Sequence, residues 1–284
     1  DEITNNQKLV EILINRNSDA LKGIRQDYRT LYGQDLLHVL ANIHRKNPVA
    51  RLAYLRMCEK QDRDAEIINY SLCGGCLNVN TLIEVACTRT SAELWCIKQA
   101  YRSRYNSDVE QDVARKISGG FKEILPAVFK SCRNYNGRVD MSMAMCDAKT
   151  LYEAIESEKT IDQKTIISLL SQRNSGQVKA ILVSYKQLYG HEFSKSLKRS
   201  KCGQFGKELR IAIRCMQNPE KFFAKQLRMR TADSREILIR TVATQSEIDI
   251  NDINKAFAAK TGSSLENLAR REFNKDKNNI VASI

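Results

Sequence analysis

The 284-residue sequence is poor in the residues that interrupt helices, with only three prolines and twelve glycines. Proline removes a backbone hydrogen-bond donor, and glycine is costly to order inside a helix, so their scarcity favours long helices. The alternation of apolar and polar residues that marks a half-buried strand does not stand out anywhere. We therefore predict an all-α fold.

Long apolar runs are also lacking. A helix that crosses a bilayer needs roughly 20 consecutive apolar residues, and no run approaches that length, so we expect no transmembrane segment. The first residues, Asp1 to Thr4, have neither the basic start nor the apolar stretch of a signal peptide. The nine cysteines are odd in number and scattered, unlike a disulfide framework. We expect a cytoplasmic protein.

Positive charge is in excess, because 46 lysines and arginines face 33 acidic residues, which gives a net charge of +13. Such a balance attracts anionic partners, namely lipid head groups, nucleic acid or acidic proteins, but does not choose among them. A solvated basic surface without a dedicated partner is the alternative. Tyr28, Tyr101 and Tyr185 share the helical register of buried leucines and isoleucines, so we assign them to the core and do not expect a nucleic-acid partner.

One helical pattern occurs four times, at offsets of 73, 84 and 72 residues, and its positions stay apolar throughout. A recurring supersecondary unit is therefore predicted. The four copies contain Leu9, Ile24, Tyr28 and Leu36; Leu82, Ile97, Tyr101 and Val109; Ile166, Ile181, Tyr185 and Phe193; and Leu238, Ile253, Phe257 and Leu265.

The copies define units of about five helices, of which the first lacks its opening helix. Capping signals in that unit are Asn17-Ser18-Asp19 before the second stripe, Gly33 after it and Pro48 at the start of a later helix. The long polar connection after the second unit divides the chain into two halves, each a pair of units. The expected boundaries are 1–60, 61–131, a linker at 132–140, 141–217 and 218–284.

Several segments at the repeat period resemble the annexin family, over essentially the whole chain. The segments that carry the resemblance are Leu82 to Thr90, Leu31-Tyr32-Gly33, Leu188-Tyr189-Gly190, Ile117 to Phe121, Arg63-Asp64-Ala65 and Ala243 to Ile250. Arg63-Asp64-Ala65 and Pro219 to Phe223 are most similar to plant annexins.

The resemblance implies four five-helix repeats closed into a curved disc, and calcium-dependent binding to acidic phospholipid. In the family, a Gly-x-Gly-Thr loop between the first two helices of a repeat supplies carbonyl oxygens to calcium. An acidic side chain further along the repeat completes the site. Calcium takes six to eight oxygen ligands, and glycines let carbonyl groups converge, so the pattern suits the ion.

The sequence departs from this pattern in most repeats. The acidic position holds Ile43, Lys116 and Ser200 in repeats one to three, and the acid is kept only as Glu272. A lysine in that position repels a divalent cation. We therefore expect at most one weak calcium site, in repeat four, from the carbonyl groups of Arg228, Arg230 and Ala232 with Glu272. The alternative for Glu272 is a solvated surface carboxylate.

Basic side chains stand in the membrane-facing loops where the family holds calcium. Near an anionic membrane each contributes about 1 kcal/mol, and arginine can bind phosphate with two hydrogen bonds. We predict acidic-lipid binding with little or no calcium. The residues are Lys46, Lys116, Lys159, Arg228 and Arg230. Ordinary solvated cations are the alternative.

Other chemistry is sparse. Cys73 and Cys76 have the spacing of redox and zinc sites, but further zinc ligands are missing, so a redox role competes with loop cysteines of no function. The three histidines show no catalytic spacing, and we predict no enzyme. The main hypothesis is a peripheral membrane protein. The alternative is a soluble helical scaffold that binds protein or RNA without lipid or calcium.

Overall fold

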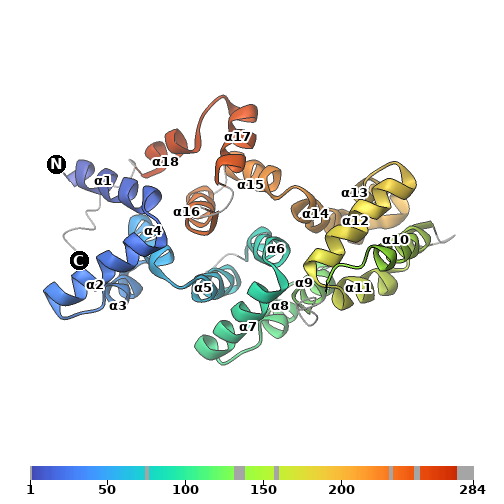
Figure 1. Cartoon of the computed structure of the whole chain (residues 1–284), viewed down its shortest axis with the longest axis horizontal. Coiled ribbons are helices and arrows are strands. Elements are labelled where there is room, and N and C mark those ends of the chain that lie inside the picture. Colours follow the sequence, from blue (N-terminus) through green and yellow to red (C-terminus); the bar gives the residue numbers. More distant parts are fainter. Residues whose placement is uncertain are drawn as a thin grey trace. The chain divides into compact units, whose positions relative to one another are not determined.

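The computed structural model describes residues 2–73, 77–130, 138–156, 160–229, 233–245 and 250–273, and these residues form helices and connections without a strand. Figure 1 shows their order. The helices are α1 Glu2–Asn15, α2 Ser18–Tyr32, α3 Leu36–Ile43, α4 Pro48–Met57, α5 Lys60–Cys73, α6 Val79–Thr88, α7 Ser91–Tyr105, α8 Val109–Lys116, α9 Phe121–Lys130, α10 Met141–Glu156, α11 Gln163–Gln172, α12 Ser175–Tyr189, α13 Phe193–Ser196, the 3-10 helix η2 Ser200–Cys202, α14 Gly203–Gln217, α15 Pro219–Arg228, α16 Ser234–Gln245, α17 Ile250–Thr261 and α18 Leu265–Phe273.

The chain forms two compact units that differ from the expected halves. Unit 1 contains residues 1–63 and 220–284, and unit 2 contains residues 64–219. The expected division at the connection after the second repeat is therefore wrong. Helices of the first and fourth copies of the pattern pack together, as do those of the second and third. The packing of helices from different copies decides which copies form one unit. The length of a connecting segment does not indicate this grouping.

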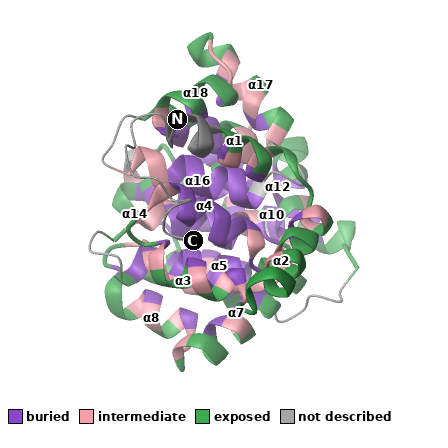
Figure 2. Ribbon diagram, turned by 90° about the vertical axis from the view of Figure 1, so that its left-hand side faces the viewer, coloured by how far each residue is buried: buried purple, intermediate pink, exposed green. Residues whose placement is uncertain are grey.

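The core of unit 1 is built around α4. This helix packs against α16, α3, α1 and α2, and its side chains from Val49 to Arg56 are buried. Figure 2 shows α4 and α16 as largely buried ribbon. Its two arginines are held by polar partners: Arg51 bonds Glu236 at 3.2 Å, and Arg56 donates to the carbonyl group of Leu13 at 2.9 Å. Burial of these charges is thus compensated.

Unit 2 is built in the same way, with α9 at its centre. This helix packs against α8, α11 and α6, while α10 covers α12 and α14 lies on α6. Tyr101 and Tyr185 are fully buried, as predicted. Their hydroxyl groups bond the Asp112 carboxylate at 2.9 Å and the Ser196 hydroxyl at 2.8 Å. A buried tyrosine needs such a partner to offset desolvation.

Helix ends follow the local sequence signals. The Asn17 side chain accepts from the N–H of Ala20 at 2.9 Å and caps α2. Gly33 ends that helix at φ +70°, a left-handed conformation that glycine adopts without strain. Pro48 stands in the first turn of α4. These three predictions are confirmed.

An arginine at the end of the second helix joins that helix to the first in unit 2. Arg89 bonds Asp64 of α5 at 2.6 Å, and Arg173 bonds Asp147 of α10 at 2.7 Å. In both cases the partner is a carboxylate of the first helix, so the arginine has a structural role. Arg16, which follows α1 at the equivalent position, is exposed.

The apolar stripe of α2 is less buried than its pattern suggests. Leu21 is buried, but Ile24, Leu31 and Tyr32 are 37%, 76% and 65% exposed. In unit 2, α10 covers the corresponding helix α12, and Tyr152 stacks on Tyr189 with ring centroids 4.0 Å apart. The described part of the chain contains no such covering helix for α2.

Candidate membrane-binding loops

The candidate site of repeat two lies where α5 ends and where α8 connects to α9. Lys116 is the last residue of α8. Its ammonium group donates to the Leu72 carbonyl oxygen at 3.2 Å and lies 3.2 Å from the Cys73 sulfur. A cation is favourable at the carboxyl end of a helix, where carbonyl groups lack partners. The lysine therefore binds backbone oxygen at the end of the first helix.

Cys73 is exposed at this point. Its sulfur accepts from the Lys116 ammonium at 3.2 Å and from the Asn69 amide at 3.9 Å. Cys76, the other member of the predicted redox pair, lies outside the described residues, so the pair stays a prediction.

Repeat three places cations in the equivalent connection. Lys159 lies outside the described residues, and η2 begins at Ser200, which replaces the acid. On either side of it, Arg199 and Lys201 both form ion pairs with Glu156, the last residue of α10; the Lys201 to Glu156 distance is 3.9 Å. As in repeat two, positive groups from the later connection reach the end of the first helix.

Arg199 and Lys201 were not among the predicted residues, because they stand on either side of the aligned position and not at it. A signal was present, since four cations fall within seven residues. These are Lys195, Lys198, Arg199 and Lys201.

In repeat one, Lys46 lies exposed in the connection from α3 to α4. Buried His44 anchors the base of this connection, because its ring stacks on Tyr54 with centroids 4.2 Å apart. Arg51 lies 3.1 Å from His44 Nδ1. Arginine only donates hydrogen bonds, so Nδ1 accepts and the imidazole is neutral. The exposed Lys46 thus lies next to a segment that is held in place by the packed side chain of His44.

In repeat four, Arg228 is exposed at the end of α15. Arg230 and Ala232 lie outside the described residues. The Glu272 carboxylate is 15% exposed and accepts from Arg271 at 3.4 Å. It is therefore mostly covered, unlike the solvated surface carboxylate of the alternative interpretation.

Within the described residues, no group of three or more histidine, cysteine or acidic side chains could hold a metal ion. A calcium site built from backbone carbonyl groups would not form such a cluster. The predicted set in repeat four therefore stays a prediction. Likewise, within the described residues no helix is long and apolar enough to cross a membrane.

Together, the repeated helices and the paired connections between them define an all-helical repeat protein. The sequence model of the annexin family matches residues 3–42, 63–128 and 146–210. The chain belongs to the annexin family. The family binds phospholipid membranes peripherally and in general depends on calcium; it is not generally enzymatic.

Relatives of similar identity come from plants and animals. Annexin A13 of Homo sapiens is 31% identical over 99% of this chain and 90% of its own length. Annexin D7 of Arabidopsis thaliana is 31% identical over 99% and 89%, and the annexin-like protein RJ4 of Fragaria ananassa is 30% identical over 96% and 87%.

Solved structures give the same fold. Annexin III matches with a TM-score of 0.75 at 25% identity, over 96% of this chain and 89% of that one. A calcium-bound structure of annexin (Sm)1 matches with a TM-score of 0.69 over 95% and 81%; at 21% identity this supports the fold alone. The predicted all-α annexin-repeat fold is confirmed.

Proposed function

We propose that this chain binds acidic phospholipid surfaces mainly through cations fixed in the connections between helices, with calcium contributing at most one weak site. The contact that carries the proposal is the bond from Lys116 to the Leu72 carbonyl oxygen, 3.2 Å long. An ammonium group there occupies backbone oxygen at the end of the first helix, and it repels a divalent ion placed nearby.

Repeat three supports the same arrangement. Arg199 and Lys201 share Glu156 as their carboxylate partner, so the local charge stays positive after pairing. Lys195 and Lys198 are exposed beside them. Guanidinium and ammonium groups on a membrane-facing connection gain about 1 kcal/mol each near anionic lipid.

The proposed lipid-binding set is Lys46, Lys116, Lys159, Arg228 and Arg230, to which we add Arg199 and Lys201. The weak calcium site consists of the carbonyl groups of Arg228, Arg230 and Ala232 with Glu272. The protein acts in the cytoplasm and at membrane surfaces, without enzymatic activity.

Co-sedimentation with phosphatidylserine vesicles tests the proposal. The chain should bind in the presence of a calcium chelator, release as salt rises because the charges are screened, and ignore neutral phosphatidylcholine vesicles. Binding seen only with calcium, or indifferent to salt, would refute charge contact. No binding under either condition would favour the soluble scaffold.

A further inference from the structure

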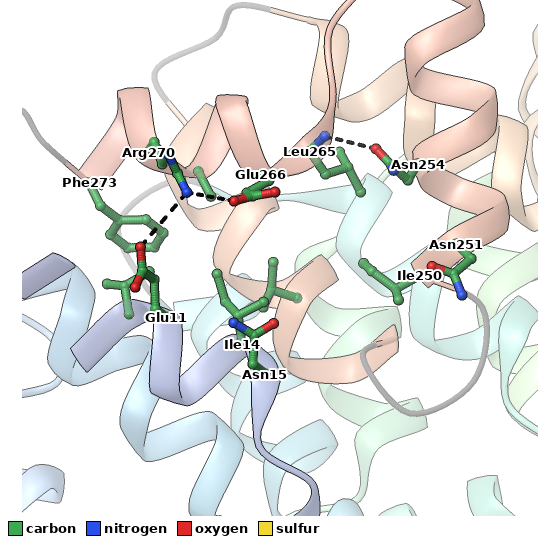
Figure 3. A pocket seen from close by; sticks show the side chains of 13 residues that line it. Glu11, Ile14, Asn15, Ile250, Asn251, Asn254, Leu265, Glu266, Arg270 and Phe273 are labelled. Atoms are coloured by element: carbon green, nitrogen blue, oxygen red, sulfur yellow. Dashed lines mark hydrogen bonds and ion pairs between the residues drawn. The ribbon is translucent and has the colours of Figure 1, made fainter. Parts of the chain in front are cut away.

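A cavity of about 490 Å³ lies in unit 1 among α1, α16, α17 and α18 (Figure 3). Its volume falls within the range of roughly 300–1,000 Å³ that is typical of pockets for small molecules. Such pockets have mostly apolar walls and a few polar groups that orient the ligand. Both features are present in the lining of this cavity.

Apolar side chains form most of the wall. Five of them are buried and belong to three different helices, and two partly exposed isoleucines complete the surface. The buried residues are Val10 of α1, Val242 of α16 and Leu265, Ala269 and Phe273 of α18, and the isoleucines are Ile14 and Ile250. The wall therefore suits the hydrocarbon part of a ligand.

One end of the cavity is acidic. Arg270 of α18 forms an ion pair with Glu266 at 2.7 Å and a longer one with Glu11 of α1 at 3.9 Å. Figure 3 shows these three side chains together, beside the ring of Phe273. The described residues that line the cavity include no other charged side chain. Two carboxylates thus share one guanidinium group, and the excess negative charge lies on Glu11, which is the more distant partner.

The other end of the cavity carries neutral amide groups from α17. The side-chain oxygen of Asn254 accepts a hydrogen bond of 2.9 Å from the Leu265 N–H. Asn251 is exposed at the same end, as Figure 3 shows. An amide group both donates and accepts hydrogen bonds, so it does not favour either sign of charge. The charge preference of the cavity therefore depends on its acidic end.

The sign of this charge is opposite to that of the whole protein. A net charge of +13 attracts anions to the surface in general. In the cavity, an anionic head group would meet a guanidinium group that two carboxylates already hold. A cationic head group can pair with Glu11 instead. Charge complementarity therefore selects a ligand that the overall charge of the protein disfavours.

We propose that this cavity binds a small cationic amphiphile, with its apolar body against α1, α16 and α18 and its protonated amine beside Glu11. None of the described cations of the proposed lipid-binding set lines the cavity. The inference therefore does not depend on lipid binding.

Isothermal titration of the full chain at pH 7 with decylamine and with decanoate tests this, at concentrations below those at which either probe forms micelles. The probes have the same chain length and opposite charges at this pH. Wild-type protein should bind decylamine saturably and at least about fivefold more tightly than decanoate. Shortening the amine by one methylene group should weaken binding about fourfold, because a buried methylene contributes about 0.8 kcal/mol.

Glu11→Gln tests the acidic end. The Glu11 side chain is 58% exposed, so the fold should tolerate the change. This variant should bind decylamine about fivefold more weakly, and Glu11→Lys should reverse the preference in favour of decanoate. The control Glu153→Gln makes the same charge change at an exposed position of α10, outside the cavity, and should bind both probes within about twofold of wild type.

Tighter binding of decanoate than of decylamine by wild-type protein would overturn the proposal, as would the absence of saturable decylamine binding or an equal loss in Glu153→Gln. A variant that ends at Phe273 identifies one competing occupant. If this variant binds decylamine and the full chain does not, residues 274–284 cover the cavity and the proposal is wrong. Co-sedimentation of wild-type protein with vesicles tests the membrane proposal separately.

Discussion

Glu208 in α14 accepts a hydrogen bond of 2.8 Å from the backbone N–H of Phe121, the first residue of α9. The bond ties the fifth helix of repeat three to the Ser118-Gly119-Gly120 connection of repeat two. Gln204 donates to the same carboxylate at 2.7 Å. Glycines are required here because a Cβ atom on Gly120 would lie 2.8 Å from Glu208 Oε2 and 3.2 Å from the Phe205 Cα.

Gly120→Ala should therefore destabilise the protein by about 1–3 kcal/mol, since backbone and a buried carboxylate must move. Gly23→Ala is the matched control: nothing lies within 4 Å of its added Cβ, and its mid-helix position should gain roughly 0.5–1 kcal/mol. Urea unfolding followed by circular dichroism measures both. Equal effects of the two changes would contradict the role of Glu208.

Asp35 makes unit 1 sensitive to acid. A hydrogen bond from Arg25 lowers the pKa of Asp35 from 3.8 to about 2. A lowered folded-state pKa stabilises the protein above the unfolded-state value, and this contribution is lost as pH falls from about 4 to 2. Both side chains are about one-third exposed, so the gain is below about 1 kcal/mol.

Asp35→Asn separates this charge effect from helix capping, because asparagine still caps α3. The variant should be less stable than wild type at pH 6, and the difference in unfolding free energy should shrink at pH 3. A difference that is constant with pH would show that the ion pair does not stabilise the fold.

Glu272→Gln tests the weak calcium site. Neutralising the carboxylate removes the charge that compensates the ion, so any calcium-dependent part of vesicle binding should vanish while binding in chelator persists. Glu266→Gln in the same helix is the control, since its side chain is 69% exposed. Vesicle binding is measured at increasing calcium concentrations. An unchanged calcium response in Glu272→Gln would show that Glu272 is not a calcium ligand.

Arg199→Gln, Lys201→Gln tests the repeat-three cations. Loss of two charges should weaken vesicle binding in chelator by up to about 2 kcal/mol and flatten its dependence on salt. Lys149→Gln, Lys186→Gln alters two exposed helix positions instead and should change neither. If both double variants bind vesicles equally well, the net charge of the protein drives binding and the cations in these connections have no special role.

Helices and their ends were predictable because their causes are local. Asn17, Gly33 and Pro48 act within a few residues, and the apolar register of Tyr101 and Tyr185 marked them as core. Exposure of Leu31 and Tyr32 was harder to predict, because a stripe is buried only where another helix covers it.

The site was predictable only in part. Aligned positions identified Lys116, but its partner Leu72 is 44 residues away and follows from three-dimensional packing. Arg199 and Lys201 escaped detection because each lies one residue from the aligned position, and their convergence on Glu156 appears only in the fold.

The most direct test of fixed cations in place of calcium is Lys116→Glu, assayed on phosphatidylserine vesicles with chelator and with calcium. Charge reversal should weaken binding in chelator by about 2 kcal/mol, and calcium should restore part of it by bridging the new carboxylate to lipid phosphate. Lys149→Glu should lose less, being outside the connections. Undiminished binding by Lys116→Glu in chelator would contradict the account.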